Sequence, residues 1–242
     1  MINLITMATR PKALSDKLGI TCKRMFKPAY QARPGMYLPM IINQCGKPVL
    51  EIGTWGCSLP QLHMPMSTFP TEKILTQAPL NRWIHTQRCL VPANCFFARI
   101  SGEANPVLVR LLQSRLFLIG GLYQALHTPE NKTVYSFLLL STESADVLRP
   151  LMQEMPLIMT TEHLQDWLNG EHLVDLMQIA DSAGDQWFDY FPVSREILQP
   201  GINKRELLKP LGMSKFEQSE RELKLKAIDI RQDRFNRKAS KR

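Results

Sequence analysis

Apolar residues in this chain fall mainly into short runs bounded by Pro, Gly, Asn and Ser, a pattern that favours strands over long helices. The runs that predict strands lie at residues 36–43, 48–55, 106–112, 115–123, 133–141 and 187–193. Turn residues at 44–47 and 113–114 predict that the first two runs form one hairpin and the next two form another. The pattern therefore indicates a mostly antiparallel sheet.

One further stretch, residues 88–100 (R-C-L-V-P-A-N-C-F-F-A-R-I), has two apolar halves that are rich in β-forming residues. The halves are Cys89-Leu90-Val91 and Cys95-Phe96-Phe97, and Pro92-Ala93-Asn94 between them is typical of a turn. The stretch predicts two buried strands around a tight bend.

Helix signals are short and lie outside these runs. Residues 9–19 carry a proline in the first turn, Leu14 and Leu18 on one face, and Gly19 at the stop. From Lys215 onward, apolar positions at helical spacing among many charges predict a solvated amphipathic helix that ends in a disordered run. Helices are also predicted at residues 143–153, 161–170 and 172–180.

Charge is distributed unevenly along a chain of otherwise ordinary globular composition, which is 44% hydrophobic and 21% charged. The net charge is +8, and residues 214–242 hold +5 of it from ten Lys/Arg and five Asp/Glu, which leaves +3 on residues 1–213. A basic surplus favours a polyanion such as nucleic acid, and a merely solvated helix face is the alternative. We therefore divide the chain into a domain at 1–213 and a basic tail at 214–242.

Several classes of protein are disfavoured. Apolar runs are too short for a membrane span and no signal peptide is evident, so a cytoplasmic protein is expected. The five cysteines form no C-x-x-C pair and are expected to be reduced. The generic catalytic signatures and metal-ligand spacings are missing, so neither a cofactor nor a metal is expected. The histidines are His63, His85, His127, His163 and His172.

Residues 88–99 resemble the R-C-L-V-P-A-[DN]-x-[FW]-[FY]-x-x motif of the SRAP family, the SOS response-associated peptidase-like proteins that bind single-stranded DNA and cross-link to abasic sites. The resemblance runs to about residue 211. It implies an α+β, SRAP-like fold: a mostly antiparallel, curved, barrel-like sheet with short peripheral helices, followed here by the charged C-terminal helix. Six other segments match in the same order: residues 1–20, Ala32-Arg33-Pro34-Gly35, Trp55-Gly56, Gly121-Leu122-Tyr123, Met155-Pro156-Leu157-Ile158 and Pro192-Val193-Ser194-Arg195.

The same resemblance places the family's reactive groups at positions that are replaced in this chain. The family's nucleophile is an N-terminal cysteine whose amine and thiol capture the abasic aldehyde, and Ile2 occupies the matching position. Ala98 matches a proton-handling glutamate and Met152 matches a histidine. The segment that positions sugar and phosphate falls around Ser67. Alanine and methionine have no titratable group, so they cannot supply general acid–base catalysis.

Other replaced positions change the charge of the expected site. Arg99 takes the place of a tryptophan of the family pattern, and Glu154 that of an arginine. The residues that we expect to contact single-stranded DNA, if it binds, are Arg33, Trp55, Arg88, Arg99 and Arg195.

Three functions follow as alternatives. The leading hypothesis is a degenerate, non-catalytic SRAP-like protein that binds single-stranded DNA or a partner in the DNA-damage response. The second is an active SRAP-type enzyme (cross-linking, autoproteolysis or a lyase) that uses unmatched residues, and the losses at Ile2, Ala98 and Met152 weigh against it. The third is a protein-interaction module of phage or mobile-element origin, with the former cleft filled by side chains such as Met66, Phe69 and Met152.

Overall fold

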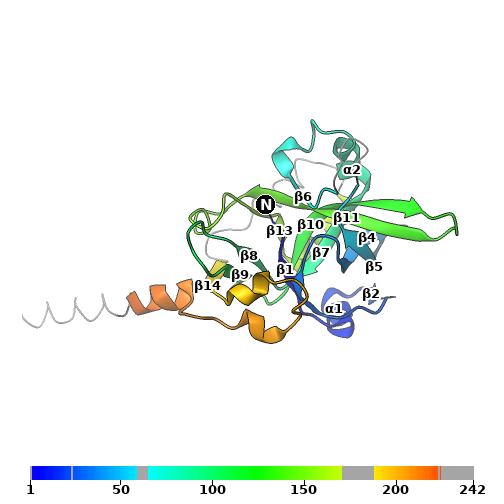
Figure 1. Ribbon diagram of the computed structural model, residues 1–242. Coiled ribbons are helices and arrows are strands. Elements are labelled where there is room, and N and C mark those ends of the chain that lie inside the picture. Colours follow the sequence, from blue (N-terminus) through cyan, green and yellow to red (C-terminus); the bar gives the residue numbers. More distant parts are fainter. Residues whose placement is uncertain (1, 23, 59–64, 171–187, 223, 225–242) are drawn as a thin grey trace, which may run out of the picture.

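The computed structural model describes residues 2–22, 24–58, 65–170, 188–222 and 224. Within these ranges the chain forms two β-sheets with short helices around them, so the predicted α+β class is confirmed (Figure 1). No helix in these ranges is both long and apolar enough to cross a membrane.

The larger sheet closes on itself. Its order is β12 (Glu154–Pro156), β11 (Thr133–Glu143), β10 (Phe117–His127), β7 (Arg88–Ala93), β4 (Tyr37–Gln44), β5 (Lys47–Trp55) and β2 (Thr21–Cys22), with β13 (Ile158–Met159) against β10 and β6 (Thr68–Pro70) against β11. β11 also pairs in parallel with β5, so five strands, β11, β10, β7, β4 and β5, form a closed ring. This ring is the barrel that the resemblance implied.

The smaller sheet has the order β14 (Phe188–Pro192), β9 (Val107–Leu111), β8 (Cys95–Ala98), β1 (Ile5–Met7) and β3 (Ala29–Ala32). One face packs on the barrel, where Phe96 and Phe117 meet edge to face with ring centroids 6.3 Å apart. The other face packs against the 3-10 helices η4 (Arg195–Leu198) and η5 (Arg205–Leu208), which bury Ile197 and Leu207 against it.

The central stretch forms the two predicted strands, but they belong to different sheets. β7 lies in the barrel between β4 and β10, whereas β8 lies in the smaller sheet between β1 and β9. The bend at Asn94 therefore carries the chain from one layer to the other. Its side-chain Oδ1 accepts the backbone N–H of Ala8 at 2.6 Å, which ties the bend to the end of β1.

One predicted hairpin is present and one is not. β4 and β5 pair from Tyr37↔Thr54 to Gln44↔Lys47, as the pattern predicted. The runs at 106–112 and 115–123 became β9 and β10, but β9 pairs with β8 and β14 and β10 pairs with β7 and β11. The turn between them changes sheet, because each strand has other partners that bury its apolar side chains.

The helices are short and lie at the edges. They are α1 (Pro11–Leu18), α2 (Leu80–Thr86), α3 (Leu164–Asn169), the 3-10 helices η1 (Thr71–Lys73) and η2 (Thr161–His163), and a helical stretch at residues 215–222. Gly19 ends α1 with a left-handed φ of 65°. The prediction of a helix at 143–153 is wrong. β11 extends to Glu143, and residues 146–151, which include Pro150, form turns instead of a continuous helix. The helix predicted at 172–180 lies outside the described residues.

Candidate functional site

A hollow of about 470 Å³ lies where the start of β1, the end of β8, β6 and the segment before β12 meet. We call it the N-terminal hollow. The pairing of β1 with β8 is antiparallel, with Ile5 opposite Phe96, and the same register brings Asn3 close to Ala98. β11 completes the wall, because it pairs with both β6 and β12. The lining residues are Asn3, Thr68, Pro70, Phe97, Ala98, Arg99, Ser141, Leu151, Met152, Gln153 and Glu154.

Hydrogen bonds fix the polar side of this hollow. Thr68 Oγ1 donates to the carbonyl oxygen of Ile2 at 2.9 Å, which joins β6 to the start of β1. Ser141 Oγ donates to Glu154 Oε2, also at 2.9 Å. Asn3 and Arg99 are exposed at the hollow and make no hydrogen bond to another described side chain. The hollow thus offers neutral and charged groups that can contact a polar ligand.

Of the four replaced positions, two line the hollow and two do not. Ala98 and Met152 line the hollow. Ile2 is 1% exposed and packs in the core directly behind it, next to Asn3. Ser67 is half-buried and does not line the hollow, and its carbonyl oxygen accepts hydrogen bonds from the Trp55 indole at 2.8 Å and from the backbone amide of Leu139.

The hollow is open rather than filled. Of the three side chains that the interaction-module hypothesis placed in the cleft, Met152 lines it. Phe69 and Met66 instead pack in a core cluster that contains Ile84 of α2 and Trp167 of α3. Its two charged residues, among those that the structure describes, are Arg99 and Glu154, which balance each other. The hollow therefore matches neither the filled apolar cleft of that hypothesis nor a strongly basic one.

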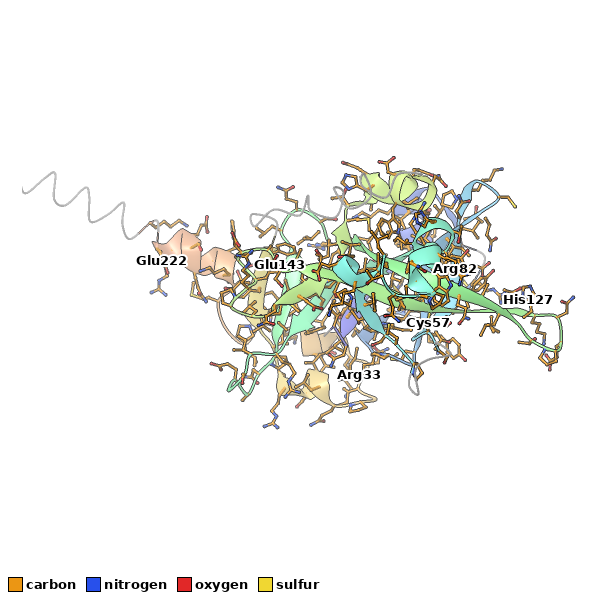
Figure 2. The ribbon with its side chains drawn as sticks, turned by 90° about the horizontal axis from the view of Figure 1, so that it is seen from above. Arg33, Cys57, Arg82, His127, Glu143 and Glu222 are labelled. Atoms are coloured by element: carbon orange, nitrogen blue, oxygen red, sulfur yellow. The ribbon has the colours of Figure 1, made fainter. Side chains whose placement is uncertain are left out.

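The residues expected to contact DNA are spread widely. Arg99 lies at the hollow. Arg33 is half-buried beside η4, where its Nη2 donates to the carbonyl oxygen of Ile197 at 2.8 Å and burial lowers its pKa. Arg195 is exposed in η4. Figure 2 shows Arg33 well apart from Glu143. Glu143 lies opposite Glu154, a residue of the hollow, in the antiparallel pairing of β11 with β12.

Two of these expectations need correction. Arg88 is 7% exposed, and its guanidinium donates to carbonyl oxygens at the ends of two helices, among them Ile84 at 2.7 Å and Trp167 at 2.6 Å. Burial lowers its pKa. Trp55 has no exposed surface, and its indole N–H is already bonded. Both residues hold the fold together and neither presents a surface to a strand of DNA.

No thiol replaces the missing nucleophile among the described residues of the hollow. Burial raises the pKa of Cys57 to about 11 and that of Cys95 to about 12, so both remain protonated near neutral pH and are poor nucleophiles. Neither these nor Cys22, Cys45 and Cys89 line the hollow. Across the described part of the chain, no group of three or more His, Cys, Asp or Glu is placed to hold a metal ion.

Sequence reasoning missed several polar side chains of the hollow, chiefly Asn3, Ser141 and Gln153. Asn3 carried a usable signal, because it is the polar residue in the alternation Ile2-Asn3-Leu4, in which both neighbours are 1% exposed. Ser141 had none, since it ends an apolar run and its role depends on how β11 pairs with β12.

The fold agrees with comparisons to known proteins. The sequence profile of the SOS response associated peptidase (SRAP) family matches residues 1–200. The chain therefore belongs to the SRAP family, and the resemblance carried by the seven motifs is confirmed.

Named relatives and solved structures extend this result. The chain is similar to the abasic site processing proteins YoqW and YoaM of Bacillus subtilis, at 26% identity in both cases, over 76% and 77% of this chain and 86% of each relative. A Bacteroides thetaiotaomicron protein superposes with a TM-score of 0.76 over 86% of this chain and 99% of that one, at 14% identity. A phage-related protein of Bordetella bronchiseptica superposes with a TM-score of 0.65 over 80% and 94%, at 18% identity. These structures share the fold.

Proposed function

We propose that this chain is a non-catalytic SRAP protein that binds single-stranded DNA at abasic sites reversibly, with the N-terminal hollow as the receptor for the sugar of the abasic site. The observation that carries the proposal is the state of the nucleophile position. Ile2 is 1% exposed, its side chain belongs to the core, and its carbonyl oxygen is held by Thr68. A covalent adduct through this side chain has no chemical basis.

The hollow supports retained binding. Its volume of about 470 Å³ lies within the range of roughly 300–1,000 Å³ that is typical of small-molecule sites. Asn3, Thr68 and Gln153 can exchange hydrogen bonds with sugar hydroxyl groups, and Arg99 can meet a phosphate. The names of YoqW and YoaM assign abasic site processing to relatives of this chain, which makes an abasic site the first ligand to test.

The test compares three single-stranded oligonucleotides of one sequence that contain an abasic site, a tetrahydrofuran analogue without the aldehyde, or an intact nucleotide. We expect equal affinity for the first two, because no aldehyde chemistry contributes, and weaker binding of the third. A denaturing gel should show no adduct with any of them. A stable covalent band with the abasic strand alone would refute the non-catalytic proposal.

Two further experiments, a borohydride treatment and the variant Ile2→Cys, separate this proposal from the hypothesis that the chain is an active enzyme. Borohydride reduces an imine to a stable amine, so a band that appears only after borohydride treatment would reveal a lyase that uses an amine of this chain. Ile2→Cys alone should not produce the family's adduct, because Ala98 and Met152 still lack the titratable groups that handle the protons.

A further inference from the structure

A second and larger hollow, of about 990 Å³, lies at the opposite end of β1. We call it the basic groove. In the antiparallel β1–β8 pair, Asn3 and Ala98 belong to the N-terminal hollow, whereas Ala8 and Asn94 line the basic groove. Figure 1 marks the N-terminus on one side of β1 and α1 on the other. The two hollows are therefore separate places on the same strand.

The basic groove concentrates the charge of the domain. Five cations line it: Arg10, Arg110, Arg115, Arg205 and Lys209. Arg110 is paired with Asp189 at 2.9 Å, and the other four are exposed and form no salt bridge with any described residue. Glu206 is the single acid among the described residues of the lining, so the four unpaired cations leave a surplus of three positive charges. That equals the whole net charge of residues 1–213, so the rest of the domain is close to neutral.

The floor of the groove is apolar and held in place. Phe191 and Leu108 come from adjacent strands of the smaller sheet and are each 4% exposed. The Arg110 guanidinium lies 5.1 Å from the centre of the Phe191 ring while it pairs with Asp189. A half-buried aromatic residue, Tyr30, stands at the rim. Grooves that follow a single strand of nucleic acid combine basic residues with accessible aromatic side chains, and Tyr30 is the one accessible aromatic residue among the described residues of this lining.

The start of the basic tail adjoins this groove. Asp189 Oδ1 accepts the backbone N–H of Phe216 at 3.0 Å, while Oδ2 of the same carboxylate binds Arg110. Ser214 and Glu217 form reciprocal bonds, in which each backbone N–H donates to the other's side chain, and this capping box begins the helical stretch there. The buried carboxylate of Asp189 thus binds both Arg110 in the groove and the first residues of the tail.

From this geometry we infer that the basic groove is a second contact site, which holds the sugar–phosphate backbone of single-stranded nucleic acid away from the N-terminal hollow. The inference rests on the proposed function in taking DNA as the ligand, and adds where the strand is held. Four of the five cations are arginines, whose planar guanidinium groups can each donate two hydrogen bonds to the oxygens of one phosphate. The groove reads no base and should bind intact and abasic strands alike.

The experiment measures the affinity of the full chain for 16-nucleotide intact and tetrahydrofuran-containing strands by fluorescence anisotropy, at several salt concentrations. The variant Arg115→Glu/Arg205→Glu reverses two exposed cations of the groove. We expect about tenfold weaker binding of both strands and a log–log salt slope that is shallower by about 1.4, since each lost phosphate contact removes about 0.7. The preference for the tetrahydrofuran strand should stay unchanged.

The matched control is Lys47→Glu/Lys132→Glu, which makes the same change in net charge at two exposed hairpin positions outside the groove. Equal losses in both double variants, or no loss in the groove variant, would overturn the inference while leaving the proposed function intact. The proposed function would be overturned instead if the unmodified protein bound the intact and tetrahydrofuran strands equally well, while the groove variant still bound both more weakly. If poly-glutamate competes as well as DNA, the groove binds acidic chains, and the assignment to nucleic acid is wrong.

Discussion

Replacing Arg88 by alanine should destabilise the fold strongly, although arginine is usually a surface residue. The guanidinium makes three short hydrogen bonds to carbonyl oxygens, with Trp167 and Gly170 at 2.6 Å and Ile84 at 2.7 Å. These carbonyls lie in or just after the last turns of α2 and α3, where helix geometry leaves them without a partner. One buried cation therefore closes two helix ends and stabilises the negative ends of their dipoles.

The magnitude follows from counting what the alanine leaves behind. Each carbonyl that stays buried without a donor costs about 1–3 kcal/mol, and three of them are affected. The gain from no longer burying a cation, which the lowered pKa of Arg88 reflects, offsets part of this loss. We expect Arg88→Ala to lower the free energy of unfolding by about 3 kcal/mol. Arg88→Lys should recover little, because one ammonium group cannot span both helix ends.

Urea unfolding followed by tryptophan fluorescence gives this quantity, with the slope checked for constancy. Arg99→Ala is the matched control, since it removes an exposed arginine eleven positions later, and it should change stability by less than about 0.5 kcal/mol. A loss below about 1 kcal/mol for Arg88→Ala would refute the role as a double helix cap. Weakened DNA binding at unchanged stability would restore Arg88 as a candidate DNA contact.

Further predictions concern the core, the hollow and the tail. Phe97→Ala should cost about 3–5 kcal/mol in urea unfolding, because Phe97 is 6% exposed, whereas Ala98→Glu should produce no DNA cross-link on a denaturing gel. Gly121→Ala should lower the melting temperature sharply, since a Cβ there would stand 2.6 Å from the backbone oxygen of Leu138; a wild-type melting temperature would contradict this. Burial raises the pKa of Cys57 to about 11, so the protonated thiol adds roughly 2–3 kcal/mol to the free energy of unfolding. This contribution should be complete below pH about 9 and lost as pH rises through 11. The free energy of unfolding of Cys57→Ala should therefore decline less over this pH range. Deleting residues 223–242 should weaken DNA binding and flatten its salt dependence by about 0.7 per lost phosphate contact, and unchanged binding would place all contacts in the rest of the chain.

Strands could be located from the sequence, but apart from the β4–β5 hairpin their partners could not. The apolar run at residues 36–43 gave β4 to within a residue, because this strand is buried on both faces and five consecutive residues of it are therefore apolar or small. Gln113-Ser114 correctly marked the break between β9 and β10, but the two strands belong to different sheets, since turn residues mark where a strand ends and not which strand it pairs with. Pairing across the barrel, as between β5 and β11, leaves no local trace at all.

The candidate site shows the same division. Ala98 and Met152, which the motif matches singled out far apart in the sequence, line one hollow, because motifs in the same order follow the same fold. Arg88 and Trp55 were misjudged, because residue type says that a side chain can bind DNA but not whether burial prevents it. The basic groove could not be predicted from the sequence, since its cations come from β9, the loops and η5, which are far apart along the chain.

The pair that closes the barrel also bears on how the chain is made. Gly53 in β5 finds its partner Tyr135 only 82 positions later. At the roughly 5–20 residues per second of protein synthesis, that edge of β5 waits about 4–16 s on the ribosome for its neighbour. An unpaired strand edge is a template for mispairing with another chain. Nascent chains that stop before β11 leave this edge of β5 open and should therefore aggregate more readily than the full chain.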